Sequence, residues 1–270
     1  MKNTIINLFR LSSTKDISNL DDPATTIKRV KIIQQKPFLK RIYIDFYKQF
    51  KRALPSLINS EVLVELGSGA GFIKEIIPNV ITSDIIPLPN VDKQFSATNM
   101  PFDDNSIDAF FMIDVLHHIN DVKSFFKEAQ RCLKDTGKIV MIEPANTLWG
   151  KYIYQNFHHE SFDTSAGWDL EKGGPLTSAN GAIPWIIFYR DKKLFEKLFP
   201  NLKITRLKYH TPFSYLISGG FSFRQLLPSF SYNLINMIEH ILIPFNKYIG
   251  MFQTIELTKI SSLNDLKNNK

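Results

Sequence analysis

The sequence contains a single cysteine, Cys132, among its 270 residues. It can therefore form neither a disulfide framework nor a metal site built from several cysteines, and this scarcity favours a reducing compartment. The N-terminus lacks the apolar run of a signal peptide, because Arg10 interrupts the segment that begins at Ile5. The chain also lacks an uncharged apolar stretch of about 18–20 residues, so we expect no transmembrane helix.

Hydrophobic residues make up 44% of the chain and aromatic residues 13%, which is enough to bury a substantial core and to exclude general disorder. The net charge of +7 is concentrated at one end, because residues 1–60 hold 12 lysines and arginines against 4 acidic residues. A basic arm on a nearly neutral body predicts a local contact with an anionic partner rather than general nucleic-acid binding. Anionic lipid headgroups, an acidic substrate and RNA all fit this charge, and so does a solvated helix face rich in lysine.

The order of the predicted elements indicates an α/β fold. Residues 23–54 have the apolar spacing of a helix, with Phe38, Ile42, Phe46 and Phe50 on one face and Pro55 as its end. An uninterrupted apolar run at 107–113 is typical of a central parallel strand that is covered on both faces. Further strands are predicted at 62–66, 80–84, 138–143, 202–207 and 251–260, and further helices at 72–77, 122–133 and 191–199.

The composition divides the chain into five parts. They are a basic helical arm (1–55), a core of alternating strands and helices (56–145), an insertion (146–190), the rest of the core with an apolar insertion at 212–250 (191–260), and a flexible tail (261–270). A long segment without clear periodicity inside a compact domain is usually a lid or a binding element. The aromatic residues of the insertion, Trp149, Trp168, Trp185, Phe188 and Tyr189, suit an apolar or aromatic ligand or an ordinary secondary core. The apolar segment at 212–252 could form a pocket roof, a dimer contact or a membrane contact.

The strongest motif is a glycine loop, Gly67-Ser68-Gly69-Ala70-Gly71, which follows an apolar strand and Glu65. Glycines at alternate positions allow a sharp turn and the close approach of a ligand to the backbone. The helix predicted to start at Phe72 would add free N–H groups. A dinucleotide fingerprint needs its third glycine at position 72, so the spacing argues against NAD.

With its preceding Glu65, this loop resembles the first motif of class I S-adenosylmethionine-dependent methyltransferases, especially the small-molecule branch that includes ubiquinone-biosynthesis enzymes. The resemblance continues at Asp84 and in the segments 100–108, 114–119 and 133–138, in the order and spacing of the family. It implies a doubly wound, mostly parallel sheet of the class I methyltransferase type, with an N-terminal helical arm and a lid insertion.

By this resemblance, S-adenosyl-L-methionine is the expected cofactor. Asp84 would bind both ribose hydroxyls, and Glu65 would steady the loop or the ammonium of the amino-acid tail. Ser96 stands where many family members place an acid for the adenine amino group, so we expect the backbone around Ala97 to hold adenine. The full predicted cofactor set is Glu65, Gly67, Ser68, Gly69, Gly71, Asp84, Ser96, Ala97, Thr98, Asp114 and Leu116.

The methyl acceptor is expected near histidines, although transfer from a sulfonium depends more on alignment than on a base. His117 and His118 follow the carboxyl end of a central strand, where α/β proteins bind ligands, and His117 is the member of this pair expected to contact the substrate. His158 and His159 precede Glu160, and a carboxylate there could orient an imidazole. His117, His158 and His159 are the catalytic candidates, although the pair at 158–159 could simply hold the lid to the body by hydrogen bonds. No metal site is expected, because adjacent ligands on one strand point in opposite directions.

The sequence thus predicts S-adenosylmethionine-dependent methyl transfer to a small, lipophilic or lipid-linked acceptor, at oxygen or carbon. The Asn-Pro-Pro-Tyr or Asp-Pro-Pro-Tyr motif of nucleobase N-methyltransferases is absent after the fourth-motif strand. The alternatives are a non-catalytic S-adenosylmethionine-binding partner or sensor and, after that, an RNA methyltransferase. We expect a cytoplasmic protein that could associate with the inner face of a membrane and has no DNA partner. The acceptor and the oligomeric state are left open.

Overall fold

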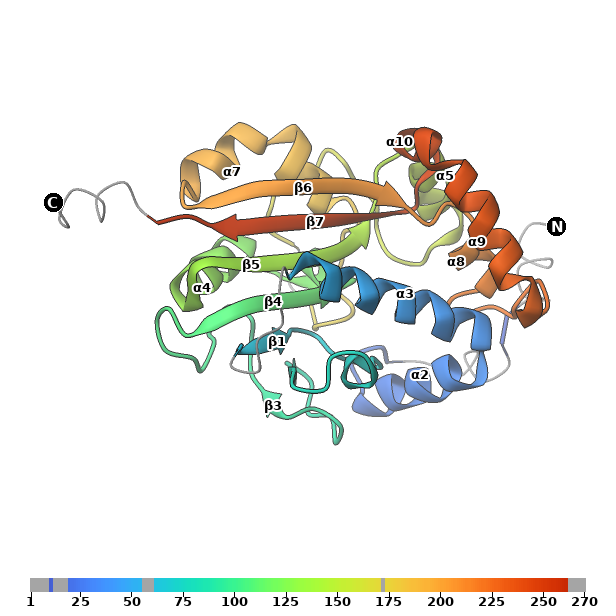
Figure 1. The fold of residues 1–270 in the computed structure, drawn as a ribbon, viewed down its shortest axis with the longest axis horizontal. Helices are drawn as coiled ribbons and strands as arrows, with labels where there is room; N and C mark the ends of the chain where they lie inside the picture. Colours follow the sequence, from blue (N-terminus) through green and yellow to red (C-terminus); the bar gives the residue numbers. More distant parts are fainter. Residues whose placement is uncertain (1–9, 12–18, 55–60, 171–172, 262–270) are drawn as a thin grey trace, which may run out of the picture.

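The computed structural model describes residues 10–11, 19–54, 61–170 and 173–261. Its centre is a seven-stranded sheet in the order β3-β2-β1-β4-β5-β7-β6 (Figure 1). Every pairing is parallel except the two that β7 makes with its neighbours, which confirms the predicted doubly wound, mostly parallel sheet. The strands are β1 (Leu63–Glu65), β2 (Ile81–Asp84), β3 (Lys93–Gln94), β4 (Ile107–Ile113), β5 (Leu133–Pro144), β6 (Leu202–His210) and β7 (Phe252–Lys259).

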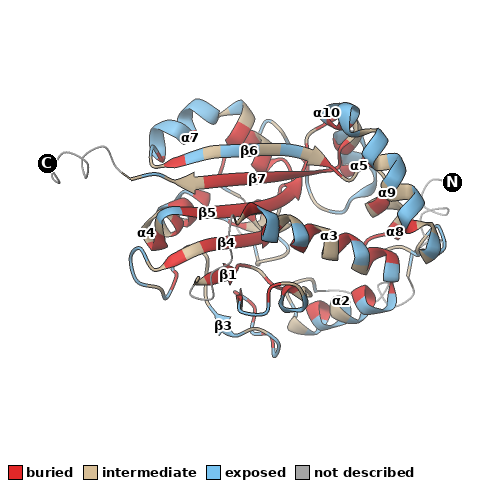
Figure 2. Ribbon diagram, viewed as in Figure 1, coloured by how far each residue is buried: buried red, intermediate tan, exposed pale blue. Residues whose placement is uncertain are grey.

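Strand β4 lies at the centre of the core. It covers the predicted apolar run at 107–113, and its inner residues Ala109 to Met112 are fully buried, because helices and loops cover both faces of the sheet. Phe111 stacks on Phe50, with ring centroids 4.9 Å apart and planes tilted by 14°. Figure 2 shows the central strands buried along most of their length.

The N-terminal segment forms two helices instead of the single predicted one: α2 (Pro23–Gln35) and α3 (Pro37–Ala53). The break falls at Lys36, because the residue before a proline is disfavoured in the helical conformation. The buried Lys36 ammonium donates hydrogen bonds to the carbonyl oxygens of Gly220 (2.5 Å) and Phe223 (2.8 Å). Pro55, the predicted end of the helix, lies outside the described residues.

The helix predicted at 72–77 is wrong. Only a 3-10 turn, η2 (Ile73–Glu75), follows the glycine loop. The N–H of Phe72 donates to the hydroxyl of Tyr47 (3.1 Å), and Phe72 has a non-helical backbone conformation. Branched side chains at Ile76 and Ile77, the second directly before Pro78, further disfavour a helix.

Helices α4 (Val122–Cys132) and α7 (Lys192–Leu198) confirm two predicted helices. The Asp121 carboxylate caps α4 by accepting a hydrogen bond from the N–H of Ser124 (2.9 Å). Phe126 of α4 contacts Phe195 of α7 edge-on, with ring centroids 5.2 Å apart. These contacts form a secondary aromatic core.

The insertion at 146–190 contains a helix that we did not predict, α5 (Leu148–Phe157). Its N-cap is Thr147, whose hydroxyl accepts from the N–H of Gly150 (2.9 Å). A short helix, α6 (Ile183–Trp185), and a π-helical turn, η4 (Ile186–Arg190), close the insertion. Trp168 and Phe188 are buried in the hydrophobic core and do not line the pocket described below.

The C-terminal apolar insertion lies between β6 and β7. It forms α8 (Ser214–Ser218), η5 (Ser229–Ser231), α9 (Tyr232–Ile241), η6 (Ile243–Phe245) and α10 (Asn246–Ile249). Tyr232 at the start of α9 donates a hydrogen bond to Asp45 of α3 (2.6 Å), and its ring packs edge-on against Phe38. The basic arm and the apolar insertion therefore lie side by side (Figure 1). None of the described helices is long and apolar enough to cross a membrane.

The five-part division of the chain remains a prediction. Of the predicted tail at 261–270, all but Ser261 lies outside the described residues.

Candidate functional site

A pocket of about 1280 Å³ lies at the carboxyl ends of β1 and β4, where the strand order reverses. Open α/β sheets bind their ligands at this position. Single-ligand pockets have volumes of about 300–1,000 Å³, so this one has room for two molecules. The structure brings together on its walls every predicted site residue except one: Glu65, Gly67, Ser68, Gly69, Gly71, Asp84, Ser96, Ala97, Thr98, Asp114, His117, His158 and His159.

The glycine loop forms one wall of the pocket. Gly67 and Gly69 have φ values of 63° and 47°, a left-handed conformation that glycine adopts without a steric penalty. A Cβ atom at Gly67 would lie 2.5 Å from a methyl group of Val115. The loop is thus packed closely against the segment that follows β4, and only glycine fits at its first turn.

Asp84, at the end of β2, presents its carboxylate to the same wall. One oxygen accepts from the N–H of Gly69 (2.9 Å) and the other from the N–H of Ile86 (2.9 Å). Burial raises the pKa of Asp84, and these backbone hydrogen bonds oppose the rise. A carboxylate has about four lone-pair positions, so Asp84 can still accept hydrogen bonds from two ligand hydroxyls.

Glu65 is buried beneath the loop. Burial raises its pKa to about 8; a hydrogen bond with Ser68 opposes this rise and the charge of Asp84 adds to it. Its Oε2 atom has no hydrogen-bond partner among the residues that the structure describes. Because a buried polar atom without a partner costs free energy, Oε2 fits a cationic ligand group such as an ammonium.

We expect the binding of S-adenosylhomocysteine to strengthen as the pH rises from 6 to 7.5. In the free protein Glu65 is largely protonated below its pKa of about 8, whereas an ammonium partner favours the carboxylate, so binding releases a proton. Calorimetry at pH 7 in two buffers of different ionisation enthalpy measures this release.

Glu65→Gln is the matched variant and should reduce the release by about one proton. The groups that face Glu65 are Tyr47, whose pKa burial raises well above 10, and Asp84, and neither is replaced in the variant. An unchanged proton release in Glu65→Gln would remove Glu65 from the binding reaction.

The segment 96–98 forms the wall next to β3. The hydroxyls of Ser96 and Thr98 lie 2.8 Å apart, and the N–H of Thr98 donates to Ser96 Oγ (3.2 Å). This wall therefore offers neutral hydroxyls and backbone groups, as expected for a chain that has serine in place of an acid.

Two residues after β4 were also predicted to bind the cofactor. Asp114 has a φ of 54° and lines the pocket, and burial raises its pKa to about 8. Leu116, in the 3-10 turn η3 (Leu116–His118), does not line the pocket, because its side chain is fully buried in the core. Its N–H donates to Glu143 (2.7 Å), and the neighbouring Val115 lines the pocket instead.

His117 is held by two carboxylates. Its Nδ1 lies 2.6 Å from Glu143 at the end of β5, and its Nε2 lies 3.4 Å from Glu160 in the insertion. The second oxygen of Glu143 accepts from the N–H groups of Val115 (2.9 Å) and Leu116 (2.7 Å). Burial alone would lower the pKa of His117, but Glu143 and Glu160 raise it well above its usual value.

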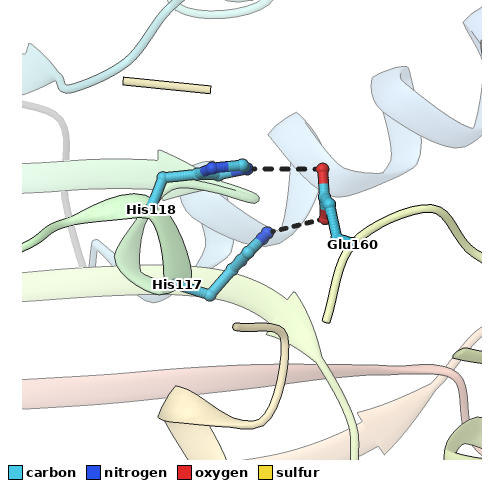
Figure 3. Close-up of side chains that lie close together, drawn as sticks. All are labelled: His117, His118 and Glu160. Atoms are coloured by element: carbon cyan, nitrogen blue, oxygen red, sulfur yellow. Dashed lines mark ion pairs between the residues drawn. The ribbon is translucent and has the colours of Figure 1, made fainter. Parts of the chain in front are cut away.

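The two predicted histidine pairs meet at the carboxylate of Glu160. Figure 3 shows the rings of His117 and His118 directed at its two oxygens. His118 Nε2 lies 3.6 Å from this carboxylate, and His158 Nδ1 and His159 Nε2 each lie 3.5 Å from it. The expectation that adjacent histidines point apart is wrong here, because residues 158 and 159 lie outside any strand.

Burial sets the protonation of this cluster. Burial and the neighbouring His117 lower the pKa of His118 to about 3, and burial lowers that of His158 to about 4. Burial alone would raise the pKa of Glu160, but its hydrogen bond to His117 and the surrounding histidines lower it.

Several pocket residues were not predicted. Arg29 of α2 and Tyr43 and Tyr47 of α3 line the pocket, so the N-terminal arm forms part of the site. In the sequence these residues belong to an amphipathic helix pattern and carry no motif. Glu143 was predicted only as a strand end, although an acid directly before Pro144 within an apolar strand was the available signal.

Comparisons with known proteins agree with this geometry. Residues 64–141 match a protein-family model described as a methyltransferase domain. No curated protein sequence is significantly similar to the chain. Among solved structures, a Thermotoga maritima protein described as a S-adenosylmethionine-dependent methyltransferase, and as a possible histamine N-methyltransferase, is 15% identical with a TM-score of 0.51. The match covers 87% of this chain and 98% of that one.

A second solved structure is a geranyl diphosphate C-methyltransferase from Streptomyces coelicolor, in complex with S-adenosyl-L-homocysteine. It is 12% identical, with a TM-score of 0.48 over 82% of this chain and 78% of that one. The glycine loop, the free hydrogen-bonding capacity of Asp84 and the unpartnered oxygen of Glu65 fit a cofactor with ribose hydroxyls and an ammonium. Residues 64–141 therefore match a methyltransferase domain, the sheet has the class I methyltransferase fold, and S-adenosylmethionine is the cofactor that fits this site.

Proposed function

We propose that this protein transfers the methyl group of S-adenosylmethionine to a small lipophilic or lipid-linked acceptor, at oxygen or carbon, as in the branch that includes ubiquinone-biosynthesis enzymes. The observation that carries the proposal is the aromatic lining of the pocket beside the histidine cluster. Tyr154, Phe157 and Phe162 line it from the insertion, and Tyr215 and Phe221 line it from the C-terminal segment. A pocket with apolar walls and a few convergent polar groups suits an acceptor with an apolar body and one polar head.

The apolar lining of the pocket continues to the molecular surface. Phe157 and Leu226 both line the pocket, and they are 42% and 54% exposed. Exposed apolar side chains at the edge of a pocket favour a ligand that arrives from an apolar phase or carrier rather than from water. This continuity supports a lipophilic acceptor over a polar one.

The residues of this chain contribute mainly alignment. The bound cofactor supplies an electrophilic methyl group on a positively charged sulfur. Asp84 and Glu65 would hold the two ends of the cofactor, and Glu143 fixes the ring of His117 beside the acceptor. Correct placement of the two reactants can supply most of the rate acceleration. A displacement of one reactant by about 1 Å can lower the reaction rate about 10²-fold.

The proposal is tested with the full chain, S-adenosylmethionine carrying a labelled methyl group, and a lipid extract of cells. We expect label in a product soluble in organic solvent. Phe157→Asp places a charge at the apolar edge of the pocket and should lower this transfer, while the affinity for S-adenosylhomocysteine stays unchanged. Leu194→Asp is the matched control, because Leu194 is 44% exposed on α7 and does not line the pocket.

The other outcomes separate the alternatives. Tight cofactor binding without transfer into any fraction would contradict the proposal and favour a non-catalytic partner or sensor. Label that enters RNA and no lipid would favour an RNA methyltransferase. Equal loss of transfer in both aspartate variants would remove Phe157 from the acceptor path.

We further propose that the protein meets an anionic membrane surface where α3 and α9 lie together. Figure 2 shows α9 with much of its surface exposed beside the exposed face of α3. Arg41 of α3 lies over the ring of Tyr232 at 5.5 Å, and Lys48 of α3 pairs with Asp45, the partner of Tyr232. The exposed apolar side chains on and next to α9 are Phe230, Leu234, Met237, Ile238, Ile241, Ile243 and Phe245.

We expect the protein to co-sediment with vesicles that contain anionic lipid. Basic residues near such a surface contribute about 1 kcal/mol each, and salt screens this attraction over about 8 Å at physiological ionic strength. Arg41→Gln with Lys48→Gln should weaken only the salt-sensitive part of binding, whereas Phe230→Ser with Ile241→Ser should weaken the part that salt does not remove.

The matched control is Lys203→Gln with Lys208→Gln, because these exposed residues lie on β6 and not on α3 or α9. An equal effect of this pair would mean that total charge, rather than the α3–α9 surface, drives binding. No co-sedimentation at low salt would rule out the membrane contact.

A further inference from the structure

The hydrogen bonds around His117 and His118 determine which ring nitrogens face Glu160. Nδ1 of His117 lies 2.6 Å from a Glu143 oxygen, and Nδ1 of His118 lies 3.2 Å from the carbonyl oxygen of Ser178. Carbonyl and carboxylate oxygens accept hydrogen bonds, so both Nδ1 atoms donate. Each Nε2 therefore faces a Glu160 oxygen (Figure 3): a neutral ring directs a lone pair at it, and a protonated ring directs an N–H at it.

With both rings neutral, this arrangement places acceptor atoms against acceptor atoms in a largely buried place. The side chains of His117, His118 and Glu160 are 2%, 11% and 16% exposed, and their facing atoms lie 3.4 and 3.6 Å apart. Lone pairs that face each other with little water present repel, unless a positive species lies between them. The two Nε2 atoms and the Glu160 carboxylate therefore need a proton or a cation between them.

The separations fit a metal ion. Two ligands at about 2.0–2.1 Å from a tetrahedral zinc ion lie about 3.4 Å apart. The separations of 3.4 Å from His117 Nε2 to one Glu160 oxygen and of 3.6 Å from His118 Nε2 to the other match this value. One Glu160 oxygen and one ring nitrogen of each histidine also lie within 4.8 Å of one another. The ring orientation fits too, because histidines that bind metals donate their other N–H to a carboxylate or a backbone carbonyl.

We propose that His117, His118 and Glu160 bind a divalent transition-metal ion of the zinc class in the acceptor half of the pocket. Imidazole nitrogens with one carboxylate suit zinc, iron, cobalt or nickel rather than magnesium or calcium. The carboxylates of Glu143 and Glu160 balance the two positive charges of the ion, although Arg29 of α2 also faces the cluster. His158 and His159 flank Glu160 and can complete the coordination shell.

Such an ion would give the pocket a Lewis acid beside the acceptor. A bound oxygen ligand would be polarised and would lose its proton more readily than in water. The proposed methyl acceptor would then bind through an oxygen atom. The metal site itself is independent of the proposed function, because it depends only on the side chains of this chain.

The test uses the full chain, stripped of metal with a chelator, with neither cofactor nor acceptor present. Titration with Zn²⁺ alone in a calorimeter should show one site, and titration with Mg²⁺ should show none. Addition of Co²⁺ should give the visible absorption band of an ordered cobalt site. His118→Ala and Glu160→Gln should each weaken Zn²⁺ binding at least tenfold and abolish the cobalt band.

His240→Ala is the matched control, because His240 is an exposed histidine on α9 that lies outside the pocket. Thermal unfolding of each variant checks that it is folded. The absence of Zn²⁺ binding by the intact chain would overturn the proposal and leave a proton as the species that joins the cluster. Zinc binding that His240→Ala weakens as much as His118→Ala would identify an adventitious ion only.

Discussion

Alanine in place of Asp84 is expected to weaken the binding of S-adenosylhomocysteine about 10- to 150-fold. The carboxylate has free capacity for two ligand hydroxyls, and hydrogen bonds to a charged group contribute about 1.5–3 kcal/mol. The variant also removes the acceptor for the N–H of Gly69, so the glycine loop loses one of its fixed contacts. Calorimetry with the purified full chain measures the change.

Asp103→Ala is the control for Asp84→Ala, because Asp103 is an exposed acid that does not line the pocket. The melting temperature of each variant without ligand separates a loss of binding from a loss of folding. An unchanged affinity in a folded Asp84→Ala protein would remove Asp84 from the site. Tight binding of NAD by the unmodified protein would contradict the assignment of the cofactor itself.

Alanine in place of Gly67 is expected to lower the free energy of unfolding by about 2–5 kcal/mol. The left-handed conformation costs a residue with a Cβ about 1–2 kcal/mol, and forcing an extra methyl group into a packed site costs about 1–3 kcal/mol. Both conditions hold here, because φ is 63° and the new Cβ would lie 2.5 Å from Val115. Denaturant unfolding of both proteins provides the measurement.

Gly167→Ala is the matched control for Gly67→Ala, because no atom lies within 4 Å of the position that its Cβ would take. Adding Val115→Ala to Gly67→Ala should recover the part of the loss that comes from crowding, but not the part that comes from φ. If the double variant is no more stable than Gly67→Ala alone, crowding against Val115 is not the cause.

The fold could be predicted where local pattern and tertiary packing agree. The strand predicted at 107–113 has the same first and last residues as β4. The apolar run marked both ends because a strand that is covered on both faces is apolar along most of its length. Helix α5 was missed because Gly150 and several aromatic residues conceal its periodicity, although Thr147 was an available N-cap signal. The turn after the glycine loop was mispredicted because Phe72, whose N–H donates to Tyr47 25 residues earlier, has a non-helical backbone conformation.

The cofactor side of the site was easier to predict than the acceptor side. Glu65, the glycines and Asp84 lie within 20 residues and follow a strand order that brings them together. The cluster around Glu160 brings together side chains from β5, η3 and the insertion. The spacing of these residues along the chain does not predict that they are in contact. The same holds for Arg29, which reaches the pocket because α2 and α3 fold back beside it.

Strand β6 is one of the two outer strands of the sheet, and no strand among the described residues pairs with its outer row of backbone hydrogen-bonding groups. Its exposed residues include Lys203, Arg206 and Lys208, and its pairing with β7 shifts register between Ile204 and Arg206. Charged side chains and irregular pairing are two ways in which proteins protect such edges from aggregation. A second copy adding its own β6 here would bring like charges together, which disfavours growth of the sheet into a fibril.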